Sequence, residues 1–204
     1  MLRLWRHESP VLQFEIPLMS VGMQKNLVLA ILAALKLKVS PAEISERLPQ
    51  YRPSALRGTR LQGRGRTYLI DCYNANPSSM LDTLDYFTRE FADQPRLLVL
   101  GGMEELGSDE EKLHREIGES QQLNADDRVV LVGSKAGWMA DGFLNSGARL
   151  EQLIPVREIE DARAVIEDFE GAVLFKGSRK NRLEELIPTW AVEPAEVEDL
   201  VASC

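Results

Sequence analysis

Residues 67–77, Thr-Tyr-Leu-Ile-Asp-Cys-Tyr-Asn-Ala-Asn-Pro, change from a strand pattern to a helix pattern within one short stretch. Positions 67–72 are largely apolar, which predicts a buried β-strand. Asn76 followed by Pro77 is typical of a helix N-cap and first turn. Apolar residues then recur at helical spacing, at Met80, Leu81, Leu84, Phe87 and Phe91. The chain therefore passes directly from a strand into an amphipathic helix.

The same alternation continues toward the carboxyl terminus. Further strands are predicted at 96–100, 128–132, 150–156 and 172–175. Helices are predicted from a capping box at Ser108-Asp109-Glu110-Glu111, over 158–169, and after Ser178. Strands that alternate with helices form βαβ units, in which helices cover both faces of a parallel sheet. The expected fold is an α/β domain with a mostly parallel sheet flanked by helices.

The amino-terminal part has a different pattern. A strand over 11–18 is followed by a strongly apolar helix over 24–37, and Ser40-Pro41 begins a second helix that ends near 48. An arginine-rich linker over 49–65 leads into the α/β domain. The predicted division is a small part with a strand and two helices, the α/β domain, and an acidic tail, over residues 1–52, 53–191 and 192–204.

The composition is that of an ordinary globular protein, with 44% hydrophobic residues, 27% charged residues and a formal net charge of −8. This charge argues against a nucleic-acid binder, which would carry a basic face. The apolar run Leu27–Leu35 is too short to span a membrane, and the amino terminus lacks the apolar core of a signal peptide. Cys72 and Cys204 are too few for a disulfide framework or a zinc site. The expectation is a cytoplasmic protein that binds neither nucleic acid nor membrane.

Polar clusters follow the predicted strands, and in an open parallel sheet ligands bind beyond these carboxyl ends. The clusters are 71–76, 101–105, 133–135 and 176–179. Cations at a helix start oppose the helix dipole, so Lys176-Gly177-Ser178-Arg179 favours a bound anion. Structural roles stay open elsewhere: capping for Asn76, tight turns for the glycines, solvation for Glu104 and Glu105, and an internally satisfied ring for His114. The residues alone predict an anion or nucleotide site at this edge.

Several motifs, in the same order, resemble the D-alanyl-D-alanine-adding branch of the Mur ligase family. They are Gly58-Thr59-Arg60-Leu61-Gln62, Asp71-Cys72-Tyr73-Asn74-Ala75-Asn76-Pro77, Val-Leu-Gly-Gly-Met-Glu-Glu-Leu-Gly over 99–107, and Lys176-Gly177-Ser178-Arg179. The Asn-Ala-Asn-Pro form separates this branch from its siblings. The resemblance implies a Rossmann-like carboxyl-terminal domain that closes over ATP and presents the incoming amine. It also implies that residues 1–52 are a remnant of the central ATPase domain.

Roles for individual residues follow from the resemblance alone. Five residues would face the nucleotide: Arg60 at the ATP phosphates, Asp71 at the ribose hydroxyls, and Asn74, Asn76 and Pro77 around them. Three would face the peptide substrate: Lys176, Ser178 and His114. The complete family enzyme uses ATP with magnesium to join D-alanyl-D-alanine to UDP-N-acetylmuramoyl-tripeptide. No metal ligand and no certain catalytic residue are expected within this chain.

The chain also departs from the family pattern. It contains no Gly-x-x-x-x-Gly-Lys-Ser/Thr, so the loop that cradles ATP phosphates is absent, together with the family's magnesium-binding region. Gly102 stands where the family has an aspartate. ATP is therefore not expected to bind tightly. One hypothesis is that the chain is part of a peptidoglycan ligase and is inactive without the missing amino-terminal and ATPase domains. The other is a non-catalytic pseudo-ligase domain that binds nucleotide or cell-wall precursor, or regulates a partner.

Overall fold

The computed structural model describes residues 2–6, 9–16 and 19–188. The chain divides into two compact units, Met1–Arg52 and Pro53–Cys204, each built from its own elements. The predicted acidic tail over 192–204 lies outside the described residues. Within the described ranges, no helix is both long enough and apolar enough to cross a membrane.

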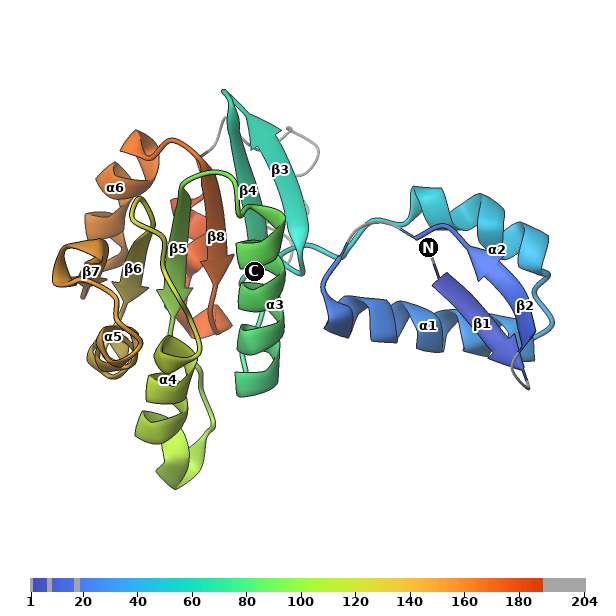
Figure 1. Ribbon diagram of the computed structural model, residues 1–204, viewed down its shortest axis with the longest axis horizontal. Coiled ribbons are helices and arrows are strands. Elements are labelled where there is room, and N and C mark those ends of the chain that lie inside the picture. The colour runs from blue at the N-terminus through green and yellow to red at the C-terminus, as the bar shows by residue number, and fades with distance from the viewer. Residues whose placement is uncertain (1, 7–8, 17–18, 189–204) are drawn as a thin grey trace. The chain divides into compact units, whose positions relative to one another are not determined.

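The larger unit is built on a six-stranded sheet with the order β3-β4-β8-β5-β6-β7 (Figure 1). Its strands are β3 (Thr59–Gly63), β4 (Arg66–Asp71), β5 (Arg96–Gly101), β6 (Arg128–Val132), β7 (Leu153–Val156) and β8 (Ala172–Lys176). Neighbours pair in parallel except β3, which pairs antiparallel with β4. The mostly parallel sheet predicted from the sequence is confirmed.

Helices cover both faces of this sheet (Figure 1). One face carries α3 (Pro77–Glu90), α4 (Glu110–Glu119) and α5 (Ala136–Asn145), and the other carries α6 (Arg163–Asp168) with the 3₁₀ segments Ile159–Ala162 and Leu183–Leu186. Successive strand residues point to opposite faces. Leu98 and Leu174 therefore pack with the first set, whereas Val99 and Phe175 pack with the second. Burial on both faces explains why these strands are almost continuously apolar.

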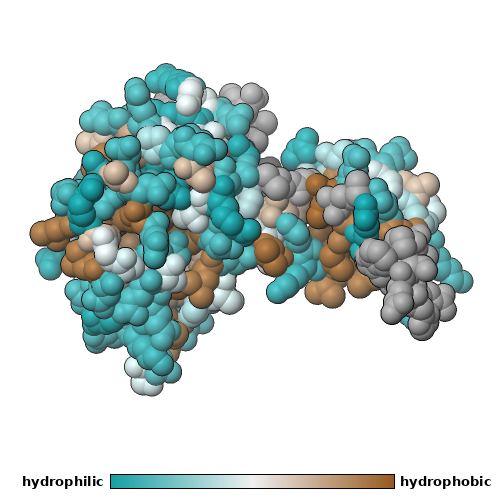
Figure 2. Space-filling model, viewed as in Figure 1, coloured by the Kyte–Doolittle hydropathy of each residue, from teal (hydrophilic) through white to brown (hydrophobic). Residues whose placement is uncertain are grey.

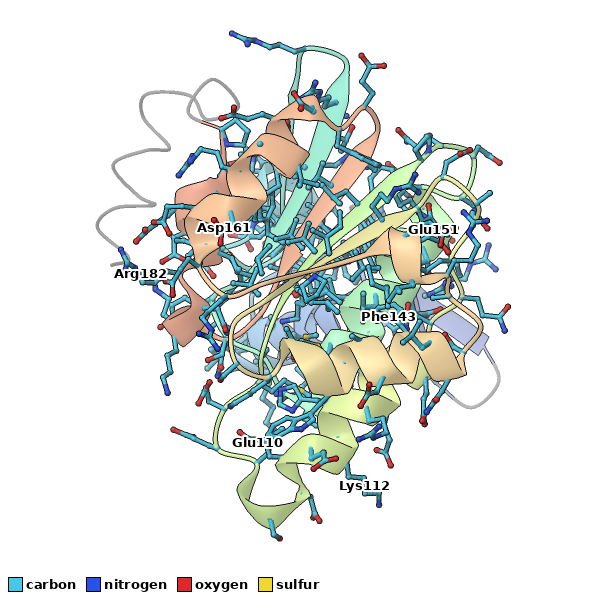
Figure 3. All side chains as sticks on the ribbon, turned by 90° about the vertical axis from the view of Figure 1, so that its left-hand side faces the viewer. Glu110, Lys112, Phe143, Glu151, Asp161 and Arg182 are labelled. Carbon is cyan, nitrogen blue, oxygen red and sulfur yellow. The ribbon has the colours of Figure 1, made fainter. Side chains whose placement is uncertain are left out.

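The helices α4 and α5 approach each other closely because two glycines leave the space. A Cβ atom at Gly118 would lie 2.4 Å from the backbone oxygen of Met139, and one at Gly142 would lie 2.0 Å from that of Arg115. Phe143, beside this contact, is fully buried and lies between α5 and the sheet (Figure 3). The two helix backbones are thus in direct contact, with no side chain between them.

A buried ion pair joins the amino ends of β5 and β6. The side chains of Arg96 and Asp127 are 4% and 0% exposed. Arg96 Nε donates to both carboxylate oxygens at 3.1 Å, and its Nη1 donates to the carbonyl of Thr88 at 2.8 Å. The carboxylate also accepts from the backbone N–H groups of Arg96 and Asn124, at 3.1 and 2.6 Å. Because each charge is met by several hydrogen bonds, the cost of burying it is offset.

The smaller unit consists of an antiparallel hairpin and two helices. Its elements are β1 (Leu2–Arg6), β2 (Ser9–Phe14), α1 (Val21–Lys36) and α2 (Pro41–Arg47). The predicted N-cap Ser40 is confirmed, and it forms a capping box with Glu43. A small core joins the hairpin to both helices through Phe14, Leu27, Ile31 and Ile44.

The helix α1 keeps apolar side chains at the surface. Leu29 and Leu32 are 65% and 46% exposed, and Leu37, just beyond the helix, is also exposed. Figure 2 shows hydrophobic residues at the surface of this unit. A groove of about 710 Å³ lies between α1 and α2 and is lined by residues that include Leu27, Ala30, Ile31, Ala34 and Ile44. The small unit therefore covers only part of its own apolar surface.

The strands β1 and β3 were not predicted, and β2 has other bounds than expected. The strand expected over 11–18 is β2 (Ser9–Phe14), and residues 17–18 lie outside the described part of the chain. Its partner β1 was not predicted. The edge strand β3 lies inside the segment interpreted as a linker.

Other predictions were wrong because 3₁₀ turns replace regular elements. Ser108 does not cap a helix: it lies in the turn Gly107–Asp109, and α4 begins at Glu110 without a side-chain cap. The strand expected from 150 begins at Leu153, and the helix expected over 158–169 divides into Ile159–Ala162 and α6. Between Ser178 and residue 188, where the described part of the chain ends, no α-helix forms, and two 3₁₀ turns are separated by Arg182 in the left-handed region.

Candidate functional site

The carboxyl ends of β4, β8 and β5 lie side by side at one edge of the sheet. Lys176 stands opposite Asp71 on one side and opposite Leu100 on the other. The chain leaves β4 and β5 toward α3 and α4 on one face, and leaves β8 toward Leu183–Leu186 on the other face. Neighbouring connections that diverge in this way define a switch point, where ligands bind in open α/β sheets. The clusters after these three strands therefore meet at the edge predicted for the site.

Asp71 is the best-placed ligand-binding side chain at this edge. Its Oδ2 accepts from Thr83 Oγ1 at 2.6 Å and lies 3.3 Å from Lys176 Nζ. These are its only side-chain interactions within the described residues, so Oδ1 has no protein donor there. The side chain is 21% exposed. A carboxylate held through one oxygen is thus fixed in position, while the other oxygen can accept from a ligand.

Lys176 is a buried internal cation and does not face solvent. It is 1% exposed, and besides Asp71 it donates to the backbone carbonyl of Asn74 at 2.7 Å. The bound anion inferred from cations at a helix start loses its basis here, because Ser178 begins a 3₁₀ turn and not a helix. The carboxylate of Asp71, and not a bound anion, supplies the negative charge that faces Lys176. Lys176 therefore shapes the loop after β4 from inside, and its contact with a peptide substrate, which the resemblance implied, stays a prediction.

Ser178 and Asn181 connect the loops after β8 and β5. The backbone N–H of Ser178 donates to the carbonyl of Gly102 at 3.1 Å. The amide of Asn181 accepts from the N–H of Gly102 at 3.2 Å and donates to the carbonyls of Gly102 and Ser178 at 2.8 and 2.9 Å. A Cβ atom at Gly101 would lie 2.6 Å from Asn181 Cγ, so glycine is needed for this contact. Ser178 is buried, and its segment is fixed by hydrogen bonds.

Asn76 and Pro77 have the structural role that the sequence left open. Asn76 Oδ1 accepts from the backbone N–H of Ser79 at 2.9 Å and caps α3, and Pro77 occupies the first helical position. Asn74 is exposed, and its Oδ1 accepts from the N–H of Ala75 at 2.8 Å. These residues set the course of the loop beside Asp71.

His114 is buried, and both of its ring nitrogens are hydrogen-bonded. Nε2 accepts from the backbone N–H of Met103 at 2.8 Å, and Nδ1 donates to the carbonyl of Glu110 at 2.7 Å. This pattern requires the neutral ring. Burial lowers the pKa of His114, with a smaller lowering from Lys135 against raising contributions from Glu110 and Glu104. This geometry fits the internally satisfied ring that the sequence left open, and the contact of His114 with a peptide substrate stays a prediction.

Lys135 organises the loops after β5 and β6. Its Nζ lies 2.5 Å from Glu110 and 3.0 Å from Glu104, and it donates to the carbonyl of Met103 at 2.6 Å. Burial acts to raise the pKa of Glu104, but Lys135 and Lys180 outweigh it and hold that pKa below its ordinary value. The prediction that Glu104 is merely solvated was therefore wrong. Figure 3 shows Glu110 at the start of α4.

The space beside Gly102 is also taken by Lys135. A Cβ atom at Gly102 would lie 2.8 Å from Lys135 Cδ and 3.4 Å from His114 Nε2. The family aspartate at this position would therefore meet the lysine side chain. Glycine at 102 and the position of Lys135 are compatible with each other.

Arg60 does not join the cluster at Asp71. It lies on β3 opposite Leu69, and its Nη1 is 2.9 Å from Glu90 at the far end of α3. Its guanidinium also lies 5.1 Å from the centre of the Phe91 ring. The contact with ATP phosphates, which the resemblance implied, stays a prediction.

Two features of this edge were missed from the sequence. Thr83 lies inside α3 and contacts Asp71 only because the helix folds back over the sheet. Arg57 stacks on Tyr73 with its guanidinium 3.9 Å from the ring centre, and no motif marked it. Cys72, between Asp71 and Tyr73, is buried, and burial raises the pKa of its thiol to about 12, so it is not a nucleophile.

Comparisons with known proteins agree on a family. A family model described as Mur ligase, glutamate ligase domain, matches residues 57–179. The UDP-N-acetylmuramoyl-tripeptide–D-alanyl-D-alanine ligase of Bacillus subtilis is 27% identical over 185 residues, which are 89% of this chain and 40% of that enzyme. The enzyme of the same name from Treponema pallidum is 31% identical over 179 residues, 85% of this chain and 38% of that enzyme. The chain thus spans about two fifths of the length of these relatives.

Solved structures share the fold. MurF from Acinetobacter baumannii matches with a TM-score of 0.72 and 25% identity, over 85% of this chain and 38% of that one. MurF from Thermotoga maritima, solved in complex with ADP, matches with a TM-score of 0.68 and 21% identity, over 91% and 40%. With the family model matching more than half of the sequence, the chain belongs to the Mur ligase family and carries its glutamate ligase domain.

Proposed function

We propose that this chain is the nucleotide-closing and amine-presenting part of a ligase that adds D-alanyl-D-alanine to UDP-N-acetylmuramoyl-tripeptide in peptidoglycan synthesis. Residues 1–52 are proposed to be the end of the central ATPase domain, and 53–191 the carboxyl-terminal domain. The partners of the chain are then the amino-terminal and ATPase domains. Relatives that are more than twice as long as the matched region support this assignment.

The observation that carries the proposal is the fixed carboxylate of Asp71 at the switch point. Thr83 and Lys176 hold one of its oxygens, and the other is open to a hydroxyl donor. Ribose hydroxyls in α/β nucleotide sites are bound by an acidic side chain in this way. Asn74, exposed beside Asp71, would add amide donors on the same side.

In the proposed reaction, ATP activates a carboxylate that the amine of D-alanyl-D-alanine then attacks. The part of this chain is to position the reactants, which lowers the entropic cost of bringing them together. Asp71 orients the nucleoside, and the capped start of α3 fixes the loop that bears Asn74. Within the described residues, no three acidic, histidine or cysteine side chains converge as a metal site. We propose that magnesium is bound by the ATPase domain.

The chain by itself is expected to bind nucleotide weakly and to be inactive, because the phosphate loop is absent from its sequence. Calorimetric titration with Mg-ATP and with adenosine tests this. We expect dissociation constants near or above about 1 mM, which corresponds to roughly −4 kcal/mol of binding free energy. Micromolar ATP binding would contradict the assignment of the phosphate contacts to a missing domain.

Activity is tested by supplying the missing domains from a relative. The ligation of D-alanyl-D-alanine to UDP-N-acetylmuramoyl-tripeptide is then measured as the rate at which phosphate is released. In that mixture, Asp71→Ala is expected to raise the KM for ATP about tenfold, the loss of one charge-assisted hydrogen bond. Asp161→Ala, an exposed aspartate on the turn before α6 (Figure 3), is the matched control and should leave the KM unchanged. Nucleotide binding without any ligation would favour the pseudo-ligase alternative.

A further inference from the structure

Thr83 is a buried polar residue on the side of α3 that faces the sheet. It is 6% exposed, and its helix neighbours Leu84 and Phe87 belong to the apolar core. A threonine inside a helix commonly donates its hydroxyl to a carbonyl of the preceding turn. Thr88 does this on the same helix, toward the carbonyl of Leu84 at 2.9 Å. Thr83 instead donates out of its helix, to Asp71 at the end of β4.

Three elements of the fold meet at one oxygen of the Asp71 carboxylate. Asp71 ends β4, Thr83 lies on α3, and Lys176 ends β8. Both partners contact Oδ2: Thr83 Oγ1 donates to it at 2.6 Å, and Lys176 Nζ lies 3.3 Å from it. The terminal torsion of an aspartate side chain is otherwise broad, so a carboxylate without such contacts takes many orientations. The two contacts on Oδ2 therefore fix the direction in which Oδ1 points.

The two contacts differ in how strongly they set this direction. Lysine carries a compact charge that attracts a carboxylate from any side, and Lys176 also donates to the carbonyl of Asn74 at 2.7 Å. The side chain of threonine is short, and its first torsion is stiff. The contact of 2.6 Å between Thr83 and Asp71 has the length of a strong hydrogen bond from a hydroxyl to a charged oxygen. Thr83 is therefore the partner that sets the orientation of the carboxylate.

We propose that Thr83 is a positioning residue, which makes Asp71 bind a single hydroxyl group of its ligand through Oδ1. A carboxylate with both oxygens free can accept from two neighbouring hydroxyl groups, one on each oxygen, as a ribose would offer them. Here Oδ2 already accepts from Thr83 and faces Lys176, and within the described residues only Oδ1 is left as an acceptor. The choice of a nucleoside as ligand rests on the proposed function, whereas the fixed oxygen is a feature of the geometry.

The test compares adenosine, 2′-deoxyadenosine and 3′-deoxyadenosine on the whole chain. Their dissociation constants are measured by nuclear magnetic resonance, from the backbone signals of the residues around Asp71. One of the two deoxynucleosides should bind about tenfold more weakly than adenosine, because it lacks the hydroxyl group that donates to Oδ1. The other should bind within about twofold of adenosine, since its missing hydroxyl has no carboxylate partner. Equal affinity of the two deoxynucleosides would overturn the proposal.

Thr83→Val removes the hydroxyl and keeps the branched shape, so the carboxylate of Asp71 can turn toward either ligand hydroxyl. Adenosine should bind about threefold more weakly, because a side chain must then be ordered on binding. The affinity ratio of the two deoxynucleosides should fall from about tenfold to below about threefold, whereas a merely structural loss would weaken all probes alike. Thr83→Ser keeps the hydroxyl and should keep the ratio. Thr88→Val makes the same change where the hydroxyl bonds within α3, and should alter neither affinity nor ratio.

The two proposals can fail separately. If Asp71→Ala weakens adenosine while Thr83→Val binds all three nucleosides as the unaltered chain does, the positioning role of Thr83 is wrong and the proposed function stands. If Asp71→Ala leaves the affinity for adenosine unchanged, or if no nucleoside shifts any signal of the chain, both proposals are wrong.

Discussion

The contact between α4 and α5 gives the sharpest prediction of stability. Gly142→Ala places a methyl group 2.0 Å from the backbone oxygen of Arg115, and no side chain can move aside to relieve this contact. Overpacking of this kind costs about 3 kcal/mol, the upper part of its usual range, because a whole helix must shift. Replacing glycine by alanine inside a helix stabilises the folded state by about 1 kcal/mol through helix propensity. The expected net loss is about 2 kcal/mol.

Gly137→Ala is the control on the same helix. Nothing lies within 4 Å of a Cβ atom at Gly137, so only the gain in helix propensity remains, about 0.5 kcal/mol near a helix end. Thermal unfolding followed by circular dichroism should show a melting temperature about 4–8 °C lower for Gly142→Ala and slightly higher for Gly137→Ala. If Gly142→Ala melts at or above the temperature of the unaltered chain, the close backbone contact described here is wrong.

Three other outcomes are expected. Asp127→Asn leaves Arg96 buried without its counter-charge and should lower the free energy of unfolding by about 3 kcal/mol in urea. Asp85→Asn, at an exposed ion pair, should change the free energy of unfolding by less than about 0.5 kcal/mol. If Asp127→Asn and Asp85→Asn lose similar amounts of this free energy, the buried pair does not have the expected role. Lys176→Met leaves the partly buried carboxylate of Asp71 without its cation and should lower the free energy of unfolding by about 2 kcal/mol. The same change should weaken adenosine binding, and full adenosine affinity would argue against a positioning role for Lys176. Because the pKa of His114 is lowered in the folded state, the unfolded state binds more protons below about pH 6.5, and stability falls there. His114→Gln has no group that gains this proton, so the difference in unfolding free energy between the unaltered chain and His114→Gln should narrow as the pH falls from 7.5 to 5.5. If the two chains lose stability in parallel over this range, the lowered pKa of His114 is wrong.

The larger unit could be predicted from sequence where local signals and burial agree. The strands β4, β5, β6 and β8 are short apolar runs buried on both faces, and such runs followed by glycine or a cap define their own ends. The edge of the sheet that carries the site followed from the same pattern, since parallel strands end on one side. The pattern marked the cluster 71–76 at this edge, whereas the specific role of Asp71 came from the family resemblance.

The features that could not be predicted from the sequence depend on contacts between residues far apart in the chain. Lys176 was interpreted as an anion-binding cation because its partner Asp71 belongs to another strand, and only the strand order brings them together. The helix expected after Ser178 does not form within the residues described up to 188, because the Asn181 side chain binds Gly102 across the sheet edge and the next residue turns left-handed. Neither contact leaves a local signal. The hairpin of β1 and β2 was missed for a similar reason, since the sequence does not mark the pairing.

The place of β8 also has a consequence for how the chain folds. Among the strands of the described residues, β8 comes last in the sequence, but it lies between β4 and β5, which are made much earlier. During synthesis, both earlier strands have an open edge until Ala172–Lys176 leaves the ribosome and inserts between them. Such long-range insertion is slow, and open strand edges can pair with other chains in the meantime. The Asp71–Lys176 pair, and with it the shape of the ligand-binding edge, therefore cannot form before the last strand arrives.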